Sequence, residues 1–548
     1  MHLRGMKNHL SGHVPGLALN SEREMLYRIG IDVGGTNTDA VMMQGQKVLA
    51  ETKQSTTADV TTGAIKAISA ILDQSSITPA DVEAVMVGTT HFINAFVQRK
   101  ELQQVAIIRV GLPMTSGIPP LVDWPGDLIR EIGDHIYMIG GGSYYTGVDY
   151  APLDISALEE AGREIKKVGL QSVAISAVFS PIRPDLEEEA ARIVRDIAGD
   201  HLKITLSHQV GGLGLVEREN AAIINASLQG QAEKVVRALE EALSTFNMTA
   251  RLYFSRNDGT LMSTDVAREF PVNTCSSGPT NSIRGAAFLT GKKDAVVVDM
   301  GGTTTDVGVL SKGFARETFE SFDIGGVRTN FTMPDVLSVG LGGGTIVRVN
   351  DTGEFSLGPD SVGFRLLQEA KVFGGDTLTA TDIAVYRGQI DLGDKAQLGE
   401  LGEALSNQIS AAMNETVEMA VDQLKTSSAS IPVILVGGGS ILIKGDIAGA
   451  SEVIHPEHGG VANAIGAAIG QVGGRVKRLF DFGQEGGREA AIKRAIAEAK
   501  QNAVDAGALE ETLEVLEIEE FPMPYMQTDT VDLCVRVAGN LDPTGRRK

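Results

Sequence analysis

A glycine-rich motif that occurs twice constrains this chain more than any other feature. Residues 31–40 read Ile-Asp-Val-Gly-Gly-Thr-Asn-Thr-Asp-Ala and residues 298–307 read Val-Asp-Met-Gly-Gly-Thr-Thr-Thr-Asp-Val, so six of the eight positions from Asp32 to Asp39 are identical in the second copy. Each copy lies between two apolar runs, which predicts a β-hairpin with a Gly-Gly-Thr turn. One copy alone is as easily an ordinary hairpin turn, but two near-identical copies, each led by Asp, favour a shared function.

The residue types of the motif suit a polyphosphate. Glycines lack a Cβ atom and allow positive φ, so consecutive backbone N–H groups can converge on a phosphate oxygen, and threonine hydroxyls add donors. An Asp at the end of the first strand can hold hydrated Mg²⁺ or orient a nucleophile. We assign Asp32 to Mg²⁺ positioning and Asp299 to Mg²⁺ or nucleophile orientation, and expect Asp39 and Asp306 to cap the hairpins. The predicted phosphate-binding residues are Gly34, Gly35, Thr36, Asn37, Gly301, Gly302, Thr303 and Thr304.

Three further segments are rich in glycine or other small residues. Residues 434–440 predict a buried strand that runs into a glycine turn, and residues 342–345 (Gly-Gly-Gly-Thr) predict another loop. Residues 462–468 predict a small-residue helix, which suits either close helix packing at a hinge or simply a tight core. We add Gly342, Gly343, Gly437, Gly438 and Gly439 to the predicted nucleotide-contacting residues.

The kind of nucleotide site follows from what surrounds the glycines. The sequence has no Gly-x-x-x-x-Gly-Lys-Ser/Thr loop, and Gly34-Gly35 does not open a helix with dinucleotide-binding spacing. A site made from two β-hairpins instead resembles that of the actin, sugar kinase and Hsp70 ATPase superfamily. This resemblance implies an α/β fold with two duplicated actin-like (ribonuclease H-like) lobes around a nucleotide cleft. It also implies that the turn at residues 437–439 lies beside the adenosine.

Strand and helix patterns alternate along most of the chain. β-Branched runs at residues 85–87, 105–110, 173–178, 296–298 and 433–436 predict buried strands, and amphipathic segments at residues 63–72, 155–168, 186–197, 232–243 and 398–424 predict helices. Such alternation predicts sheets covered by helices. The end differs, with a charged helix expected at 487–506 and strands at 509–516 and 528–537. We divide the chain into a disordered extension (1–26), an N-terminal lobe (27–215), a C-terminal lobe (216–475) and a small C-terminal α/β appendage (476–548).

Charge and cysteine content exclude several classes of protein. The chain has 48 Lys and Arg against 70 Asp and Glu, a net charge of −22, which argues against nucleic-acid binding and membrane-surface docking. Cys275 and Cys534 cannot build a disulfide framework, and Cys275 has no identifiable partner base that would make it a nucleophile. No run of about 18 apolar residues predicts a transmembrane helix. A cytoplasmic location is therefore expected.

Many short segments between residues 27 and 473 point to a narrower family. They are Gly30–Thr36 with Thr38-Asp39, Gly88–Thr90, Asn94-Ala95 with Arg99-Lys100, Arg218-Glu219, Asn225-Ala226, Ser255, Asp258-Gly259, Leu261-Met262, Ser277–Pro279, Gly285-Ala286, Asp299–Thr303, Val339-Gly340 and Gly342–Gly344. As a set they resemble the ATP-binding (A-type) subunit of the hydantoinase/oxoprolinase family, of which this chain is a short member. Ile182-Arg183-Pro184 and Thr280-Asn281-Ser282 depart from the family's usual residues, which leaves the substrate open.

The family resemblance implies a reaction. Its members hydrolyse a cyclic amide, such as a hydantoin, 5-oxoproline or a related lactam, by transferring the γ-phosphoryl group of ATP to the amide oxygen. ATP and Mg²⁺ are the implied cofactors. The sequence has no His-Glu-x-x-His, Gly-x-Ser-x-Gly or metal-spaced cysteines of its own, which suits a subunit that works with a second hydrolase subunit in an oligomer. A small-molecule kinase of the same fold and an ATPase that activates a partner enzyme remain alternatives.

Overall fold

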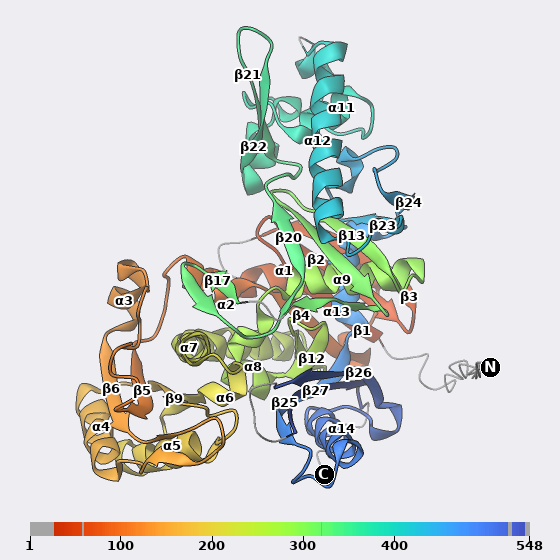
Figure 1. Cartoon of the computed structure of the whole chain (residues 1–548). Coiled ribbons are helices and arrows are strands. Elements are labelled where there is room, and N and C mark those ends of the chain that lie inside the picture. The colour runs from red at the N-terminus through yellow and green to blue at the C-terminus, as the bar shows by residue number, and fades with distance from the viewer. Residues whose placement is uncertain (1–26, 57–59, 319–320, 400, 524–528, 543–548) are drawn as a thin grey trace, which may run out of the picture.

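The computed structural model describes residues 27–56, 60–318, 321–399, 401–523 and 529–542 (Figure 1). The extension predicted for residues 1–26 lies outside the described residues. Two sheets with the same strand order form the centre of the molecule, and an inserted sheet and a C-terminal segment flank them.

The first central sheet is built around the first glycine motif. Strand β1 (Tyr27–Val33) pairs antiparallel with β2 (Asn37–Gln44), which pairs antiparallel with β3 (Lys47–Ser55). On its other side β1 pairs parallel with β4 (Val82–Thr89), and β4 pairs parallel with β11 (Arg251–Ser255). The order is therefore β3-β2-β1-β4-β11.

The second central sheet repeats this order around the second motif. Strand β13 (Ala295–Met300) pairs antiparallel with β14 (Thr305–Ser311), which pairs antiparallel with β20 (Val336–Val339). On the other side β13 pairs parallel with β23 (Ile431–Val436), and β23 with β24 (Ala450–Ile454). Because both the order and the strand directions match, the predicted fold class of two duplicated lobes is confirmed.

The C-terminal segment is α/β, as predicted, but it continues the first sheet. Strand β12 (Thr260–Ser263) pairs with β25 (Gln471–Asp481), and β27 (Thr530–Gly539) and β26 (Glu514–Pro522) follow it, giving nine strands in all. The domain boundaries predicted at residues 215 and 475 do not follow the sheets, because strands before and after each boundary belong to this nine-stranded sheet. Helix α14 (Arg488–Asp505) covers β25 and β27. Its buried face has an alanine at every fourth position, and these small side chains let the helix lie close to the backbone of Gly474.

A separate parallel sheet is inserted into the first lobe, and the sequence pattern did not set it apart. Its order is β10-β9-β5-β6, and α4 (Ile155–Val168) and α5 (Asp185–Ala198) pack on it (Figure 1). The strands are β5 (Val105–Leu112), β6 (His135–Gly140), β9 (Ser172–Ala177) and β10 (Lys203–Leu206). The bounds of α4 are those predicted, because Asp154 accepts a hydrogen bond from the N–H of Ala157 at its start and Gly169 adopts positive φ at its end.

Two helices with glycines at their contact join the lobes. Helix α13 (Ala462–Ala468), predicted from its small residues, packs against β1 and β2, and α9 (Ser277–Thr290) packs against β13 and β14. A Cβ atom on Gly285 would lie 1.9 Å from the carbonyl oxygen of Ala462, and one on Gly466 would lie 1.9 Å from that of Asn281. Only glycine allows these backbones to approach so closely.

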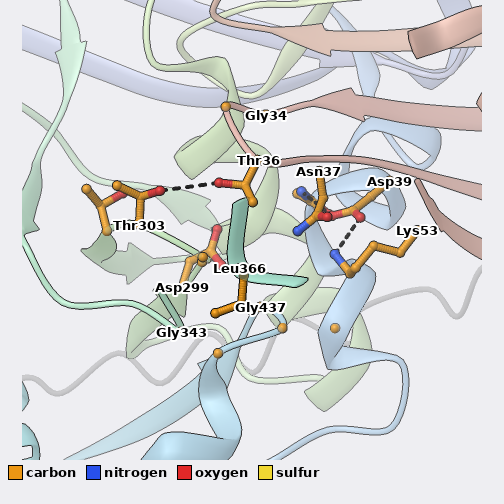
Figure 2. Close-up of a pocket in the computed structure, with 18 of the residues that line it drawn as sticks. Gly34, Thr36, Asn37, Asp39, Lys53, Asp299, Thr303, Gly343, Leu366 and Gly437 are labelled. Carbon is orange, nitrogen blue, oxygen red and sulfur yellow. Dashed lines mark hydrogen bonds and ion pairs between the residues drawn. The ribbon is translucent and has the colours of Figure 1, made fainter. Parts of the chain in front are cut away.

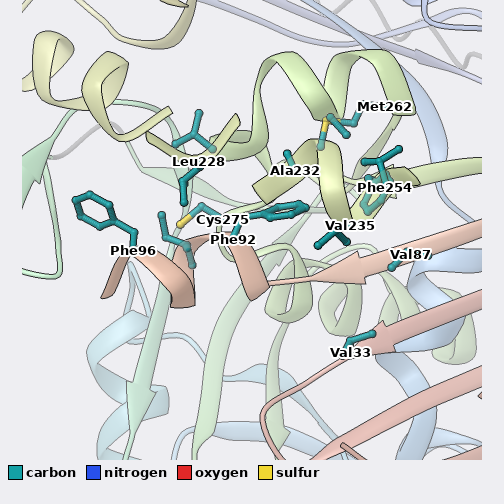
Figure 3. Packing of buried hydrophobic residues seen from close by; sticks show 14 of the residues in the cluster. Val33, Val87, Phe92, Phe96, Leu228, Ala232, Val235, Phe254, Met262 and Cys275 are labelled. Carbon is teal, nitrogen blue, oxygen red and sulfur yellow. The ribbon is translucent and has the colours of Figure 1, made fainter. Parts of the chain in front are cut away.

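The long helix α7 (Leu215–Thr245) closes the core of the first lobe. Its buried side chains meet Phe92 and Phe96 of one helix and Phe254 of β11 (Figure 3). Helices α12 (Glu403–Leu424) and α11 (Ala380–Tyr386) lie at the far end of the second lobe, beside strands β21 (Thr345–Val349) and β22 (Phe355–Ser361) (Figure 1). Among the described residues no helix is long and apolar enough to cross a membrane.

The remaining elements are short or lie at the edges. The helices are α1 (Val60–Ser75), α2 (His91–Val97), α3 (Gly126–Ile132), α6 (Ser207–Val210), α8 (Thr264–Glu269) and α10 (Leu366–Glu369). The strands are β7 (Gly142–Ser143), β8 (Asp149–Ala151), β15 (Phe314–Ala315), β16 (Glu317–Thr318), β17 (Phe322–Ile324), β18 (Val327–Thr329), β19 (Met333–Pro334), β21 (Thr345–Val349) and β22 (Phe355–Ser361). Strand β26 begins at Glu514 rather than at the predicted residue 509, because residues 510–512 form a 3-10 turn.

Candidate nucleotide site

The two glycine turns have the same geometry and face each other. The N–H of Gly34 donates to the carbonyl oxygen of Asn37 over 3.0 Å, and that of Gly301 donates to the equivalent oxygen of Thr304 over 2.9 Å. The hydroxyl oxygens of Thr36 and Thr303, one from each turn, lie 3.3 Å apart across the cleft between the lobes (Figure 2). A ligand placed there meets both turns at once.

The cleft has a volume of about 500 Å³ and collects most of the predicted site residues. Those that line it are Asp32, Gly34, Gly35, Thr36, Asn37, Asp299, Gly301, Gly302, Thr303, Thr304, Gly343, Gly437, Gly438 and Gly439. Gly342 does not line it. A Cβ atom on Gly342 would lie 2.7 Å from the backbone nitrogen of Thr303, so this glycine lets its loop pack behind the second turn. The loop also braces that turn, because the N–H of Gly344 donates to the carbonyl oxygen of Gly302 over 2.7 Å.

Apolar side chains also line the cleft, which the sequence pattern did not indicate. They are Phe364, Leu366, Leu367, Ile390, Leu392, Ile441 and Leu442, and the predicted adenosine turn at residues 437–439 lines the same cleft. Phe364 is 66% exposed and Leu367 is 58% exposed. Large apolar side chains left open beside a polar glycine turn suit a flat heterocycle such as a purine base.

Asp32 and Asp299 lie at the base of the cleft, where burial raises the pKa of both carboxyl groups. For Asp32, loss of solvation and the charge of Asp39 raise the pKa to about 7, against hydrogen bonds from the amides of Asn281 (3.4 Å) and Asn463 (3.1 Å). For Asp299, burial raises the pKa to about 6, although the hydroxyl of Ser282 donates to it.

Asp39 and Asp306 line the cleft as well, which corrects the expectation that they cap the hairpins. Each lies inside a strand directly opposite the leading aspartate of its motif. Asp39 pairs with Lys53 of β3 and accepts a hydrogen bond from Asn463 over 2.9 Å (Figure 2). Burial raises the pKa of Asp306, which accepts a hydrogen bond from Ser338. The hairpin registers bring these aspartates here, and Lys53 lies opposite Asp39 in the β2–β3 hairpin, whereas Asn463 reaches the site through tertiary packing.

Four carboxylates, those of Asp32, Asp39, Asp299 and Asp306, line the cleft. Each of Asp32 and Asp299 has its pKa raised by burial and by neighbouring aspartates, a repulsion that a cation would relieve. In the described part of the chain no three acidic, His or Cys side chains converge as a complete metal site. Mg²⁺ typically takes one or two carboxylates and completes its shell with water and phosphate oxygens, so the Mg²⁺ role of Asp32 and Asp299 stays a prediction.

Two residues of potentially reactive types, Cys275 and His91, lie outside the cleft. Cys275 is buried in the core of the first lobe, where burial raises the pKa of its thiol to about 12, so it stays a protonated thiol (Figure 3). The Nε2 atom of His91 lies 3.2 Å from the side-chain amide of Gln231 and does not line the cleft.

Comparison with known proteins gives the family. The model of the hydantoinase/oxoprolinase N-terminal region matches residues 28–198, and the hydantoinase/oxoprolinase model matches residues 218–475. The chain belongs to the hydantoinase/oxoprolinase family. Both glycine motifs and both sides of the cleft fall within the matched residues, and the match confirms the family resemblance drawn from the sequence.

Relatives and solved structures agree with this placement. The chain is 30% identical over 409 residues to caprolactamase subunit alpha of Pseudomonas jessenii, covering 68% of this chain and 56% of the relative. It is 25% identical over 408 residues to acetophenone carboxylase gamma subunit of Aromatoleum aromaticum, covering 68% and 54%. This chain thus spans about half the length of these relatives. The structure of ATP-dependent caprolactamase from P. jessenii superposes with a TM-score of 0.76 at 20% identity, over 94% of this chain and 88% of that one, which supports the fold.

Proposed function

We propose that this family member is the ATP-binding part of an enzyme that opens a cyclic amide, either a hydantoin, 5-oxoproline or a related lactam. The observation that carries this proposal is the pair of facing Gly-Gly-Thr turns, whose threonine hydroxyls lie 3.3 Å apart above two buried aspartates. Two such turns can bind one polyphosphate from both sides. The similarity to caprolactamase subunit alpha supports an amide as the acceptor.

The residues of the cleft have distinct roles in this reaction. The backbone N–H groups and hydroxyls of the two turns bind the phosphate oxygens of ATP, and the apolar side chains of the cleft bind the base. Asp32 and Asp299 would hold Mg²⁺, which supplies neutralisation of the charge on the phosphates. Asp299 also orients the amide so that its oxygen attacks the γ-phosphorus.

The chemistry explains why ATP is needed. An amide carbonyl is a poor electrophile toward water. When the amide oxygen forms a bond to the γ-phosphorus and the bond to the β-phosphate oxygen breaks, ADP leaves and the ring carbon becomes electrophilic. Water then adds to that carbon, the ring C–N bond breaks to release the amine and leave an acyl phosphate, and a second water hydrolyses the acyl phosphate to a carboxylate and free phosphate.

A partner subunit is part of this proposal. The relatives are named as subunits, and the sequence has no hydrolytic motif of its own. We infer that a second subunit completes ring opening in an oligomer. The two free, buried cysteines suit a reducing compartment, which supports a cytoplasmic location.

A carboxylase subunit is the second candidate, because the chain is also similar to acetophenone carboxylase gamma subunit. The same cleft would then phosphorylate an oxygen of a ketone substrate or of bicarbonate. Bicarbonate-dependent consumption of ATP, with a new carboxylate on the ketone, distinguishes this reaction from ring opening.

The test measures ADP and organic product together. The purified chain, alone and with any protein that co-purifies with it, is incubated with ATP, Mg²⁺ and a panel of hydantoins, 5-oxoproline and larger lactams. One ADP per opened ring supports the proposal. A stable phosphorylated alcohol would instead identify a kinase, and ATP hydrolysis that responds only to the partner protein would identify an activator.

A further inference from the structure

A second pocket of about 330 Å³ lies outside the nucleotide cleft, where several distant parts of the chain meet. Helix α6 contributes His208, the β11–β12 turn contributes Arg256, and β25 contributes Arg475 and Lys477. The loop before β19 closes it with Phe331. A volume of this size holds a small organic molecule rather than a macromolecular segment.

The charge of the pocket is opposite to that of the protein. Four fixed cations, Arg256, Arg475, Lys477 and Arg478, line it against a single carboxylate, Asp532, although the chain carries a net charge of −22. Arg475 lies 3.4 Å from Glu317 and donates to the hydroxyl of Thr332 over 3.0 Å. Arg478 pairs with Glu498 over 2.8 Å. Arg475 and Arg478 therefore already have protein partners and form part of the pocket wall.

Arg256 differs from the other arginines of the pocket. It is half-buried, its Nε atom is enclosed, and its guanidinium has no hydrogen bond or ion pair to any described residue. Its acidic neighbour Asp258 accepts hydrogen bonds from the N–H and the hydroxyl of Thr260 over 2.9 and 2.6 Å, and the charge of Arg256 lowers the pKa of this carboxyl group, but no hydrogen bond joins the two side chains. An enclosed guanidinium N–H without an acceptor is costly unless something else supplies one.

Two further polar groups face the same space. His208 is held by Glu187, whose Oε2 atom lies 2.7 Å from Nδ1, so the other ring nitrogen is left for the pocket. Glu187 is fully buried and also accepts a hydrogen bond from the N–H of Ala177 over 2.8 Å, which fixes it. Asn273 also lines the pocket, and its backbone carbonyl oxygen accepts a hydrogen bond from the N–H of Asn257, the neighbour of Arg256, over 2.8 Å. Guanidinium, imidazole and amide together suit an oxyanion.

We propose that this pocket binds the oxyanion group of a small molecule, with Arg256 as its charge partner and His208 and Asn273 as additional hydrogen-bonding groups. The ligand carries a carboxylate or is free phosphate, which share this chemistry. Binding here does not depend on which reaction the nucleotide cleft performs.

The pocket is linked to the nucleotide cleft by a short segment of chain. Asn273 lines the pocket, whereas Gly278 and Pro279 at the start of α9 line the cleft. The hydroxyl of Thr280 on the same helix donates to the carbonyl oxygen of Asn257, the neighbour of Arg256, over 3.0 Å. An anion bound to Arg256 therefore contacts the elements that hold the start of α9 beside Asp32.

Isothermal titration calorimetry with three probes tests the site. The probes are 5-oxoproline, the neutral ring 2-pyrrolidone that lacks its carboxylate, and inorganic phosphate, each titrated into the full chain with the nucleotide cleft saturated by a non-transferable ATP analogue and Mg²⁺. Arg256→Gln removes the charge, and Arg256→Lys retains it. Arg237→Gln removes the same charge from an exposed surface pair with Glu233 and serves as the matched control.

The expected result is binding of 5-oxoproline or phosphate, no binding of 2-pyrrolidone, and affinity lower by about tenfold or more in Arg256→Gln, because a charge-assisted hydrogen bond is lost. Arg237→Gln keeps the wild-type affinity, Arg256→Lys is intermediate, and thermal unfolding shows whether each variant is folded. The probe that binds identifies the source of the oxyanion. Failure of both anions to bind the wild-type chain, or equal affinity in folded Arg256→Gln, overturns the proposal. Binding of the ATP analogue is measured separately, so the nucleotide site is judged independently.

Discussion

At the scale of single residues, Asp32 links the nucleotide site to stability. Its pKa is raised from 3.8 to about 7, so between these values the folded state holds a proton that the unfolded chain has released. The free energy of unfolding therefore falls by an amount on the order of 4 kcal/mol as pH rises from about 4 to about 7, and it stays level at higher pH. In EDTA, Asp32→Asn should raise the melting temperature at pH 8 and change it little at pH 4. An equal change in melting temperature at pH 4 and pH 8 would contradict the raised pKa of Asp32.

Asp299 is the residue on which the proposed chemistry depends most. Asp299→Asn keeps the shape and the hydrogen bond from Ser282 but removes a charge that faces the phosphates. We expect ATP-dependent turnover to fall by roughly a hundredfold or more, whereas the melting temperature should not fall, because burial raises the pKa of the carboxyl group that the amide replaces. Asp73→Asn, on the exposed surface of α1, is the matched control and should retain activity. Wild-type turnover in Asp299→Asn would remove this residue from the mechanism.

At the scale of elements, the crossing of α9 and α13 sets how the lobes meet. A methyl group on Gly285 would lie 1.9 Å from a backbone oxygen that cannot move without separating the helices. Gly285→Ala should therefore lower the free energy of unfolding by about 2–4 kcal/mol and weaken nucleotide binding, since the two turns would separate. Gly402→Ala, where the added methyl group meets open space, is the control. Chemical denaturation measures both, and equal stabilities would argue against a tight crossing.

At the scale of the whole molecule, the C-terminal segment is part of the first lobe rather than an appendage. Strands β25–β27 extend the nine-stranded sheet, and their core includes Met86, Tyr253 and Leu261 from earlier strands. A chain ending at Gly470 exposes this apolar face and an open sheet edge. It should aggregate or lose cooperative unfolding, whereas a chain ending at residue 542 should behave as wild type. A soluble, folded product of the shorter truncation would show that the lobe is complete without the segment.

The sequence alone determined the local parts of this architecture. The two hairpins were predictable because the motif specifies its own turn, and their strand registers place Asp32 opposite Asp39 and Asp299 opposite Asp306. The helix at residues 462–468 was predictable from its small residues, and α4 from its helical periodicity. In each of these, hydrogen bonds and packing patterns repeat within a few residues, so a short stretch of chain contains the information.

The tertiary structure alone decided where distant segments meet. Asn463 reaches Asp32 across 431 positions, and β25 joins a sheet whose first strand lies more than 400 residues earlier. The apolar lining of the nucleotide cleft and the Arg256 N–H that lacks an acceptor likewise arise from segments that carry no shared motif. Such contacts depend on which of many compatible apolar faces pack together, and that choice is made by the whole core rather than by any local pattern. The repeated motif thus determined that two turns exist, and the packing of α9 against α13 decided that they face each other.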